Sequence, residues 1–288
     1  MLTVLAPAKV NLTLEVLAKR QDGFHEICSV IQTINLGDSL HLQLSQNIGF
    51  KSNVPEWIPE DSLVSRATSL IQKATGCSKG AVIEVNKRIP LLSGLGGDSS
   101  DAAAILRGLD KLWGLGLSTE KLLELASRLG SDVAFFLYGG TALVKGRGEV
   151  VTPLPPLPHM WVVLVVPPVP GLMGKTERLY ASLQTSHYTN GQITERLVEE
   201  LGAGRQFAHS LLFNTFENIA ATHFSEINVY WEHIMKAGAA DVHLTGSGPT
   251  LFTLVKDKTQ AEGLYIRLQQ SGMESYLTET LDATGFLE

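Results

Sequence analysis

Near the N-terminus, apolar and polar residues alternate along the chain. The apolar set is Val10, Leu12, Leu14 and Val16, and the polar set is Lys9, Asn11, Thr13 and Glu15. A period of two predicts a half-buried β-strand that carries the polar set on one face. Lys9 and Asn11 should therefore point the same way. A lone lysine in a strand is most often an edge residue in water, so this pattern alone gives Lys9 no chemical role.

Alternation and turn signals predict further elements in the first half of the chain. Asp22-Gly23 and Gly37-Asp38 are turn signals. The predicted elements are strands over 30–34 and 40–44, a loop over 47–59, a helix over 63–74 capped by Asp61 or Ser62, and a strand over 81–86.

Directly after the strand at 81–86, glycines give way to small polar residues and then to a helical pattern. The stretch is Pro90-Leu91-Leu92-Ser93-Gly94-Leu95-Gly96-Gly97-Asp98-Ser99-Ser100. Ala102, Ile105, Leu106, Leu109 and Trp113 then recur at helical spacing, with Asp98 or Ser99 placed to cap and Asp101 in the first turn. Glycines allow a ligand to approach the backbone closely, and the free N–H groups of a helix start attract anions.

This stretch predicts a phosphate-holding loop, although a glycine turn with an ordinary N-cap would look similar. A Walker A loop would end in Gly-Lys-Ser/Thr, and a dinucleotide fingerprint would follow the first strand. No lysine follows Gly97, and the loop lies about a third of the way along the chain, so neither of these motifs fits.

The middle of the chain places a carboxylate at the start of a short apolar helix. A helix is predicted from Ser118 to Leu129, and Asp132 then precedes the apolar segment 133–137. On this pattern alone Asp132 is either a plain N-cap or a catalytic carboxylate. A strand is predicted over 141–144 and a charged turn over 145–149.

A proline-rich segment between Pro153 and Pro158 is the best domain boundary, and it divides the chain into residues 1–155 and 156–288. Beyond it we predict a strand over 161–166, a loop over 167–174, helices over 175–183 and 227–235, strands over 241–245 and 250–255, a helix through 261–268 and a last strand over 275–279. Residues 186–206 show no pattern that we can assign. Helices on one side of a mainly antiparallel sheet make this an α+β protein.

Composition limits the classes of function. The 288 residues are 44% hydrophobic and 18% charged, a balance typical of a globular protein with a sizeable core. The net charge of −6 argues against binding to nucleic acid. The longest apolar run, 160–166, is too short to span a bilayer, so we expect no membrane association. Cys28 and Cys77 lack metal-ligand spacing and no signal peptide is seen, so we expect reduced thiols in the cytoplasm.

Three motifs together resemble the superfamily of galactokinase, homoserine kinase, mevalonate kinase and phosphomevalonate kinase. They are Pro7-Ala8-Lys9-Val10-Asn11-Leu12, the glycine stretch, and Leu244-Thr245-Gly246-Ser247-Gly248-Pro249-Thr250-Leu251-Phe252, in the family's order. Asp22-Gly23-Phe24-His25 and Gly130-Ser131-Asp132-Val133-Ala134-Phe135-Phe136 are most similar to the branch that phosphorylates a cytidine diphosphate-linked methylerythritol in non-mevalonate isoprenoid synthesis. The resemblance implies a ribosomal-S5-like N-terminal domain, a ferredoxin-like C-terminal domain and an active site in the cleft between them.

The resemblance also implies roles for individual residues. Lys9 and Asp132 are the implied catalytic pair, with Asp132 beside the reacting 2-hydroxyl of the small-molecule substrate. ATP, with Mg²⁺ bridging its phosphates, would be held by Pro90, Leu91, Leu92, Ser93, Gly94, Leu95, Gly96, Gly97, Asp98, Ser99 and Ser100. The implied substrate side is Asn11, Phe24, His25, Thr176, Gly246 and Ser247, with Phe24 stacked on the cytosine ring and His25 bonded to its polar edge. No metal ligand is assigned, and both a monomer and a homodimer remain open.

The chain departs from the family pattern at a few positions. Asp98 stands where relatives often have glycine, and we expect it to face solvent, cap the helix or meet Mg²⁺ through water. Thr215 replaces an aspartate, so position 215 is given no charge role, and Phe24 replaces a tyrosine found in many relatives. Two alternatives stay open: another kinase of this superfamily, acting on homoserine or mevalonate, and a nucleotide-binding regulator without turnover.

Overall fold

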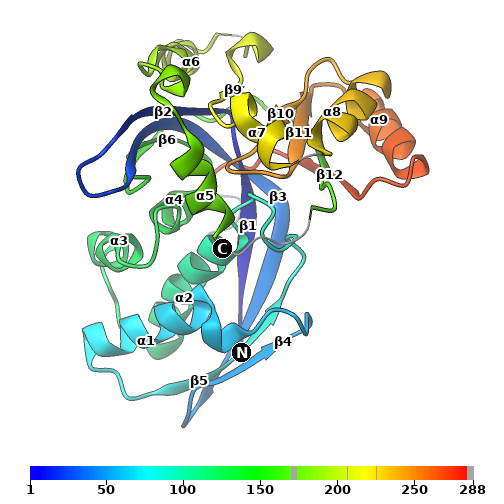
Figure 1. The fold of residues 1–288 in the computed structure, drawn as a ribbon. Coiled ribbons are helices and arrows are strands. Elements are labelled where there is room, and N and C mark those ends of the chain that lie inside the picture. The colour runs from blue at the N-terminus through cyan, green and yellow to red at the C-terminus, as the bar shows by residue number, and fades with distance from the viewer. Residues whose placement is uncertain (170–173, 206, 225, 284–288) are drawn as a thin grey trace.

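A computed structural model describes residues 1–169, 174–205, 207–224 and 226–283. Figure 1 shows two β-sheets with helices packed against them. The loop predicted over 167–174 includes residues 170–173, which lie outside the described residues. Within the described part of the chain, no helix is both long and apolar enough to cross a membrane.

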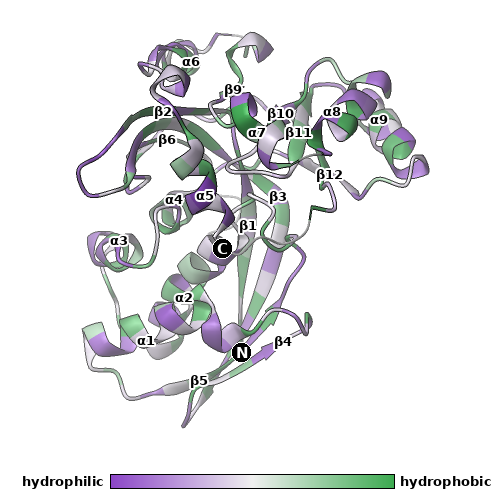
Figure 2. Ribbon diagram, viewed as in Figure 1, coloured by the Kyte–Doolittle hydropathy of each residue, from purple (hydrophilic) through white to green (hydrophobic). Residues whose placement is uncertain are grey.

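The first sheet is built around one long strand. In the described residues it contains β1 (Leu2–Asn11), β2 (Thr13–Lys19), β3 (His25–Ser45), β4 (Gly49–Ser52), β5 (Gly80–Asn86), β6 (Thr141–Gly146), β7 (Val150–Pro153) and β9 (Phe213–Asn214). Strand β3 pairs antiparallel with β1, β2, β5 and β6. Bands of hydrophobic and hydrophilic residues follow one another along β3 (Figure 2). Buried and more exposed residues alternate in its second half, from residue 34 to residue 43, whereas residues 27–34 are all buried.

The turn predicted at Gly37-Asp38 is wrong, because β3 continues straight through it. Gly37 lies opposite Pro7 at a register shift, and a β-carbon on Gly37 would come within 3.0 Å of the carbonyl oxygen of Ala6. Asp38 is buried and accepts hydrogen bonds from the backbone N–H groups of Arg88 and Ile89. Gly37 therefore allows two strands to approach closely, and Asp38 supplies a buried hydrogen-bond acceptor. Glycine and aspartate are also common in turns, which explains the wrong prediction.

Four helices cover one face of this sheet (Figure 1). They are α1 (Leu63–Thr75), α2 (Gly97–Trp113), α3 (Thr119–Ser127) and α4 (Val133–Tyr138), with the short 3-10 helix η1 (Pro59–Asp61) before α1. Ser62 caps α1 by accepting from Val64 N, and Ser118 caps α3 by accepting from Lys121 N, as predicted. Helix α2 packs directly on β1 and β3, so its N-terminal end is fixed next to Lys9.

The second sheet and the remaining helices form the other part of the molecule. The described strands are β8 (Trp161–Val165), β10 (His243–Leu244), β11 (Leu251–Val255) and β12 (Ser275–Glu279), and the helices are α5 (Lys175–Ser182), η2 (Thr185–His187), α6 (Gln192–Gly202), η3 (His209–Leu211), α7 (Glu217–His223), α8 (Ile227–Lys236) and α9 (Lys258–Gln270). The domain boundary at 155/156 falls between β7 and β8 and stays a prediction. Strand β9 nevertheless pairs with β2, so the chain returns to the first sheet after that point.

The N-terminal strand prediction is correct in position but not in exposure. The chain bends at Leu12 between β1 and β2, so Val10 and Leu12 enter one core whereas Leu14 and Val16 enter another. The polar set is buried as well, with Lys9 only 4% exposed. Both faces of this strand are covered, because helices lie on one side and the second sheet lies on the other.

Candidate active site

A cleft of about 1050 Å³ lies between the two parts of the molecule. Its walls come from β1, the turn between β2 and β3, the glycine loop, α5 and the turn after β10. The predicted residues on its lining are Lys9, Asn11, Phe24, His25, Leu92, Gly94, Gly96, Asp132, Thr176, Gly246 and Ser247. Segments distant in sequence therefore meet in one hollow.

Lys9 and Asp132 face each other inside this cleft. The Lys9 Nζ atom lies 3.8 Å from Asp132 Oδ2 and donates a 2.6 Å hydrogen bond to Asn11 Oδ1. Asn11 in turn donates from Nδ2 to Ser29 Oγ at 2.9 Å, which fixes the orientation of its amide. Burial lowers the pKa of Lys9 below its ordinary value, and attraction to Asp132 opposes the shift. An edge lysine in water is thus excluded, and the predicted common direction of Lys9 and Asn11 is confirmed.

Asp132 stands directly before α4, as predicted, but its side chain makes no capping hydrogen bond to that helix. Its side chain is 32% exposed and lies on the cleft wall. The plain N-cap interpretation is therefore wrong, since an N-cap aspartate accepts from a backbone N–H one turn into the helix. The carboxylate is available to a ligand beside Lys9.

The glycine loop is held between β1 and the turn after β10. Lys9 N donates to Leu95 O at 3.0 Å, and Thr250 N donates to Ser93 O at 3.2 Å. Gly94 has φ +87°, and a β-carbon there would lie 2.6 Å from Thr245 O. Glycine is required at this position because the backbone is left-handed and the neighbouring chain leaves no room.

The eleven loop residues predicted to hold ATP are not equally open to a ligand. Leu92, Gly94 and Gly96 line the cleft, whereas Pro90, Leu91 and Ser93 line a smaller hollow of about 320 Å³ that Leu92 also borders. Leu95, Ser93 and Ser100 are buried, and the Ser93 hydroxyl donates to Pro90 O. The Ser100 hydroxyl, by contrast, is buried without a hydrogen-bond partner. The role of all eleven residues stays a prediction.

The predicted cap of the loop helix is wrong. Helix α2 begins at Gly97 after the left-handed Gly96, without a side-chain cap, so neither Asp98 nor Ser99 is the N-cap. Asp98 instead accepts a 3.1 Å hydrogen bond from Trp57 Nε1. Asp101 lies beyond the first turn and is buried, with Oδ2 2.7 Å from Lys87 Nζ.

Phe24 and His25 occupy the far end of the cleft, on the turn between β2 and β3. Phe24 is 51% exposed, so its ring is no core residue, and the Arg147 guanidinium lies 4.8 Å from its centre. The buried His25 ring lies 5.0 Å from the Tyr180 ring at a tilt of 30°. Burial lowers the pKa of His25, with a further lowering from Lys19, so its neutral form is favoured.

The glycine turn at 246–248 contacts both Lys9 and the substrate-side helix. Asn11 N donates to Thr245 Oγ1, and a β-carbon on Gly246 would lie 3.0 Å from Lys9 Nζ. Thr176 and Ser247 share a 2.9 Å hydrogen bond between their hydroxyls, and Thr176 does not cap α5, whose N-cap is Gly174. The structure thus brings the two weaker substrate-side candidates together.

The sequence analysis assigned no role to several residues of this site, among them Asn214, Tyr180 and Lys175. Asn214 donates from Nδ2 to Leu244 O and Gly246 O and so holds the glycine turn, and Tyr180 and Lys175 line the cleft. Lys175 Nζ donates to Leu92 O at 2.8 Å and to Gly248 O, joining both glycine motifs. Burial and repulsion from Lys9 lower its pKa to about 8. The one signal for Lys175 was its place beside Thr176, and nothing in the pattern indicated its partners.

The described residues contain no group of three or more His, Cys, Asp or Glu side chains placed to hold a metal ion. Magnesium usually keeps several waters and takes one or two carboxylates plus phosphate oxygens as ligands. Phosphate oxygens and waters would therefore supply most of the ligands of Mg²⁺, and a cluster of three carboxylates is not required.

Comparisons with known proteins agree with this geometry. Residues 62–140 match the GHMP kinases N terminal domain, and residues 192–272 match the GHMP kinases C terminal domain. A crystal structure of 4-(cytidine 5'-diphospho)-2C-methyl-D-erythritol kinase superposes with a TM-score of 0.82 and 31% identity over 97% of this chain and 99% of that one. Homoserine kinase from Cytophaga hutchinsonii shares the fold, with a TM-score of 0.67 and 20% identity over 97% and 94% of the two chains.

Sequence relatives point to one branch of that superfamily. The 4-diphosphocytidyl-2-C-methyl-D-erythritol kinase of Dehalococcoides mccartyi is 49% identical over 98% of this chain and 99% of that protein. The protein of the same name from Shouchella clausii is 37% identical over 98% and 95%. The expected two-domain kinase fold is thereby confirmed, and the chain belongs to the 4-diphosphocytidyl-2-C-methyl-D-erythritol kinase family of the GHMP kinases.

Proposed function

We propose that this enzyme transfers the γ-phosphoryl group of ATP to the 2-hydroxyl of 4-diphosphocytidyl-2-C-methyl-D-erythritol, a step of non-mevalonate isoprenoid synthesis. The observation that carries this proposal is the Lys9 and Asp132 pair, 3.8 Å apart, with the glycine loop on one side and Phe24 and His25 on the other. A kinase for a cytidylated alcohol needs these three parts in one cleft.

Phosphoryl transfer asks the protein mainly for positioning and charge neutralisation, because the transferred group passes through a loose transition state. Asp132 would accept a hydrogen bond from the substrate hydroxyl and so aim its oxygen at phosphorus. A carboxylate is a weak base toward an alcohol, so the proton should move late, once the new bond to phosphorus is forming. The Lys9 ammonium would stabilise the negative charge that develops on the attacking oxygen.

The nucleotide side relies on backbone groups and cations. The first N–H groups of α2 have no intrahelical acceptor and no side-chain cap, so they would be free to bind phosphate oxygens. Lys175 bridges the two glycine motifs and would contact the same phosphates. When bound, Mg²⁺ supplies further neutralisation of the triphosphate charge.

The acceptor side offers the chemistry of base recognition. The exposed Phe24 ring gives a face on which cytosine can stack, and a neutral His25 imidazole can both donate and accept a hydrogen bond. Loss of the tyrosine hydroxyl at position 24 leaves the stacking face intact. Arg147 and Lys19 also line this end of the cleft and would attract the diphosphate of the substrate.

The test offers purified enzyme the cytidyl substrate, homoserine and mevalonate separately with Mg-ATP and measures ADP release. We expect turnover with the cytidyl substrate far above the other two. Preference for homoserine or mevalonate would overturn the acceptor assignment, and ATP binding without turnover on any acceptor would favour a regulator.

We also infer a cytoplasmic enzyme. Cys28 and Cys77 are both free, which suits a reducing compartment, and the relatives are biosynthetic kinases of a small molecule.

A further inference from the structure

A carboxylate stands at the start of the helix whose free N–H groups are proposed to bind the nucleotide phosphates. Asp98 is the second residue of α2 and follows directly on the glycines of the loop. An anion at a helix start is attracted to the free N–H groups, so Asp98 is suited to compete with phosphate for them. This competition would matter only if the loop binds ATP as proposed.

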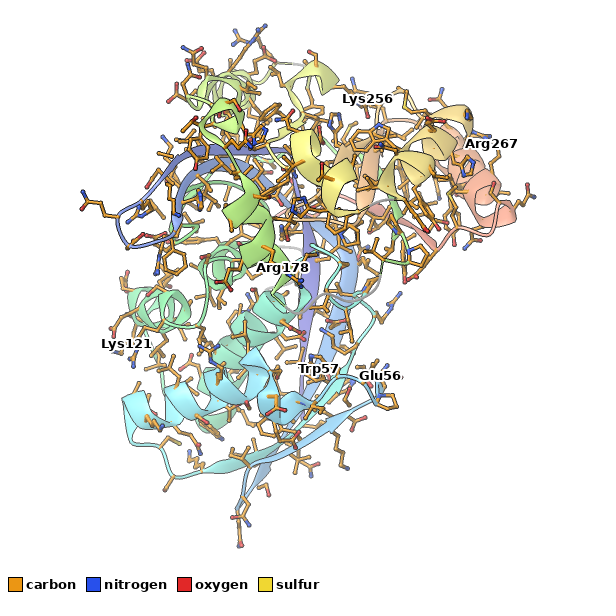
Figure 3. The ribbon with its side chains drawn as sticks, in the orientation of Figure 1. Glu56, Trp57, Lys121, Arg178, Lys256 and Arg267 are labelled. Carbon is orange, nitrogen blue, oxygen red and sulfur yellow. The ribbon has the colours of Figure 1, made fainter. Side chains whose placement is uncertain are left out.

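The Asp98 side chain is held by a tryptophan from a different part of the chain. Trp57 Nε1 donates a 3.1 Å hydrogen bond to Asp98 Oδ1. Trp57 lies on the segment between β4 and α1 (Figure 3), is 7% exposed and donates its own backbone N–H to Val54 O. The indole is therefore firmly placed, and it fixes a carboxylate that makes no hydrogen bond to its own helix start.

The nearby lysine is a weaker restraint on Asp98. Lys87 Nζ lies 3.8 Å from Asp98 Oδ1, but it lies 2.6 Å from Asp38 and 2.7 Å from Asp101, both of which are fully buried. The Lys87 ammonium therefore pairs mainly with Asp38 and Asp101, and its attraction to Asp98 is weaker. The indole N–H is the direct hydrogen-bond donor that the structure gives to the Asp98 side chain.

We propose that Trp57 is a positioning residue for nucleotide binding: its indole N–H holds the Asp98 carboxylate away from the phosphate-binding N–H groups at the start of α2. When the hydrogen bond is removed, Asp98 turns toward its own helix start and competes with the phosphates. Trp57 itself need not contact ATP for this effect.

Four proteins test the proposal: wild type, Trp57→Phe, Asp98→Asn and the double variant. Mg-ATP affinity is measured by calorimetry without acceptor, and kcat and KM for ATP are measured with it. We expect Trp57→Phe to weaken Mg-ATP binding by about two- to fivefold, the usual strength of a carboxylate at a helix N-terminus, with kcat unchanged. In the Asp98→Asn background the same substitution should have a clearly smaller effect, because asparagine keeps a hydrogen-bond acceptor but loses the negative charge that competes with phosphate.

A matched control removes a carboxylate from another helix start. Glu120 lies in the first turn of α3, is exposed and is not on the cleft wall. Glu120→Gln should leave Mg-ATP affinity unchanged, whereas Asp98→Asn should bind at least as tightly as wild type.

Each remaining outcome is informative. Equal loss of affinity from Trp57→Phe in both backgrounds would show that the indole acts through packing, and no loss in either would show that it restrains nothing; both results overturn the proposal. Failure of the wild type to bind Mg-ATP would instead remove the proposed function, and the Trp57 role with it.

A second measurement does not depend on the folding of Trp57→Phe. The chain has 4 tryptophans, so a protein labelled with ¹⁵N only at tryptophan has one indole N–H signal for each. Asp98→Ala should shift one of these signals and speed its exchange with solvent. Four unchanged signals would overturn the proposed hydrogen bond.

Discussion

Lys9 and Lys87 are equally shielded from water, yet their surroundings differ. Lys9 is 4% exposed and Lys87 is 6% exposed. Lys87 Nζ contacts two buried carboxylates, Asp38 and Asp101, at 2.6 and 2.7 Å, whereas Lys9 has one partly exposed carboxylate at 3.8 Å. Burial acts to lower the pKa of both lysines. The attraction of Asp101 and Asp38 overcomes it at Lys87, whose pKa is raised, and Asp132 does not overcome it at Lys9.

Partner geometry, rather than burial, therefore separates a structural charge from a functional one. The Lys87 cation is neutralised by its neighbours and ties β3, α2 and the segment that follows β5 together. The Lys9 ammonium has no carboxylate at hydrogen-bond distance among the described residues, so a ligand can supply negatively charged or polar atoms to it.

The largest effect is expected from removing the loose partner of Lys9. Asp132→Asn should lower kcat by about two to four orders of magnitude, since it removes a positioned acid–base group. Mg-ATP affinity and the thermal unfolding midpoint should stay close to those of wild type, because the side chain caps no helix. Steady-state kinetics and calorimetry measure both, and near-normal turnover would exclude the assigned role.

Lys87→Met should damage the fold. Two buried carboxylates would lose their cation, and breaking a buried pair in this way costs about 3–5 kcal/mol in the free energy of unfolding. The matched Lys9→Met variant should change that free energy by only about 1 kcal/mol, because a loosely paired buried ammonium is removed. Urea unfolding measures both values. Equal losses in the two variants would mean that the lysines do not differ as described.

Phe24 is half-exposed on the cleft wall, so Phe24→Ala should leave stability unchanged but weaken binding of the cytidyl substrate by about 1–3 kcal/mol, the value of one stacked base. Mg-ATP affinity should be unaffected. Leu44, which is 55% exposed on β3 and outside the cleft lining, offers a control in Leu44→Ala. A loss of substrate affinity in the control as large as in Phe24→Ala would remove the stacking role.

Lys175 is intermediate between the structural lysine, Lys87, and the functional one, Lys9. Lys175 has two carbonyl acceptors and, among the described residues, no ion-pair partner, and its pKa is lowered to about 8. Its ammonium is present below that pH and is lost above it, so Mg-ATP affinity should fall by up to about tenfold between pH 7 and pH 9. Lys175→Arg should remove the decline, because a guanidinium stays charged. A decline that persists in this variant would point to Lys9, whose pKa is also lowered.

The parts of the site that are local in sequence could be predicted. Lys9 and Asn11 lie two residues apart on one strand, so their common direction follows from the strand period. The glycine stretch is followed directly by the helical pattern that predicts α2. The approach of Asp132 to Lys9 spans more than 120 residues, and only the family resemblance supplied it.

The errors arise where distant residues decide a local structure. Residues 192–202 form α6 although its N-cap is a glycine without a side chain, and the buried Glu15 on β2 supplies the acceptor by bonding Thr194 N at 2.7 Å. Asp98 and Gly37 likewise take their roles from Trp57 and Ala6, which lie far from them in the chain. A pattern in a short stretch of sequence cannot include partners that lie so far away along the chain.

The contact between the glycine loop and the 246–248 turn bears on how the cleft can open. Thr250 N bonds Ser93 O, Gly94 leaves no space before Thr245 O, and Lys175 bridges the same two segments. The two glycine motifs thus behave as one mechanical unit, and a hinge between them would have to break all of these contacts. We therefore expect the phosphate end of the cleft to keep a fixed width when ligands bind and leave.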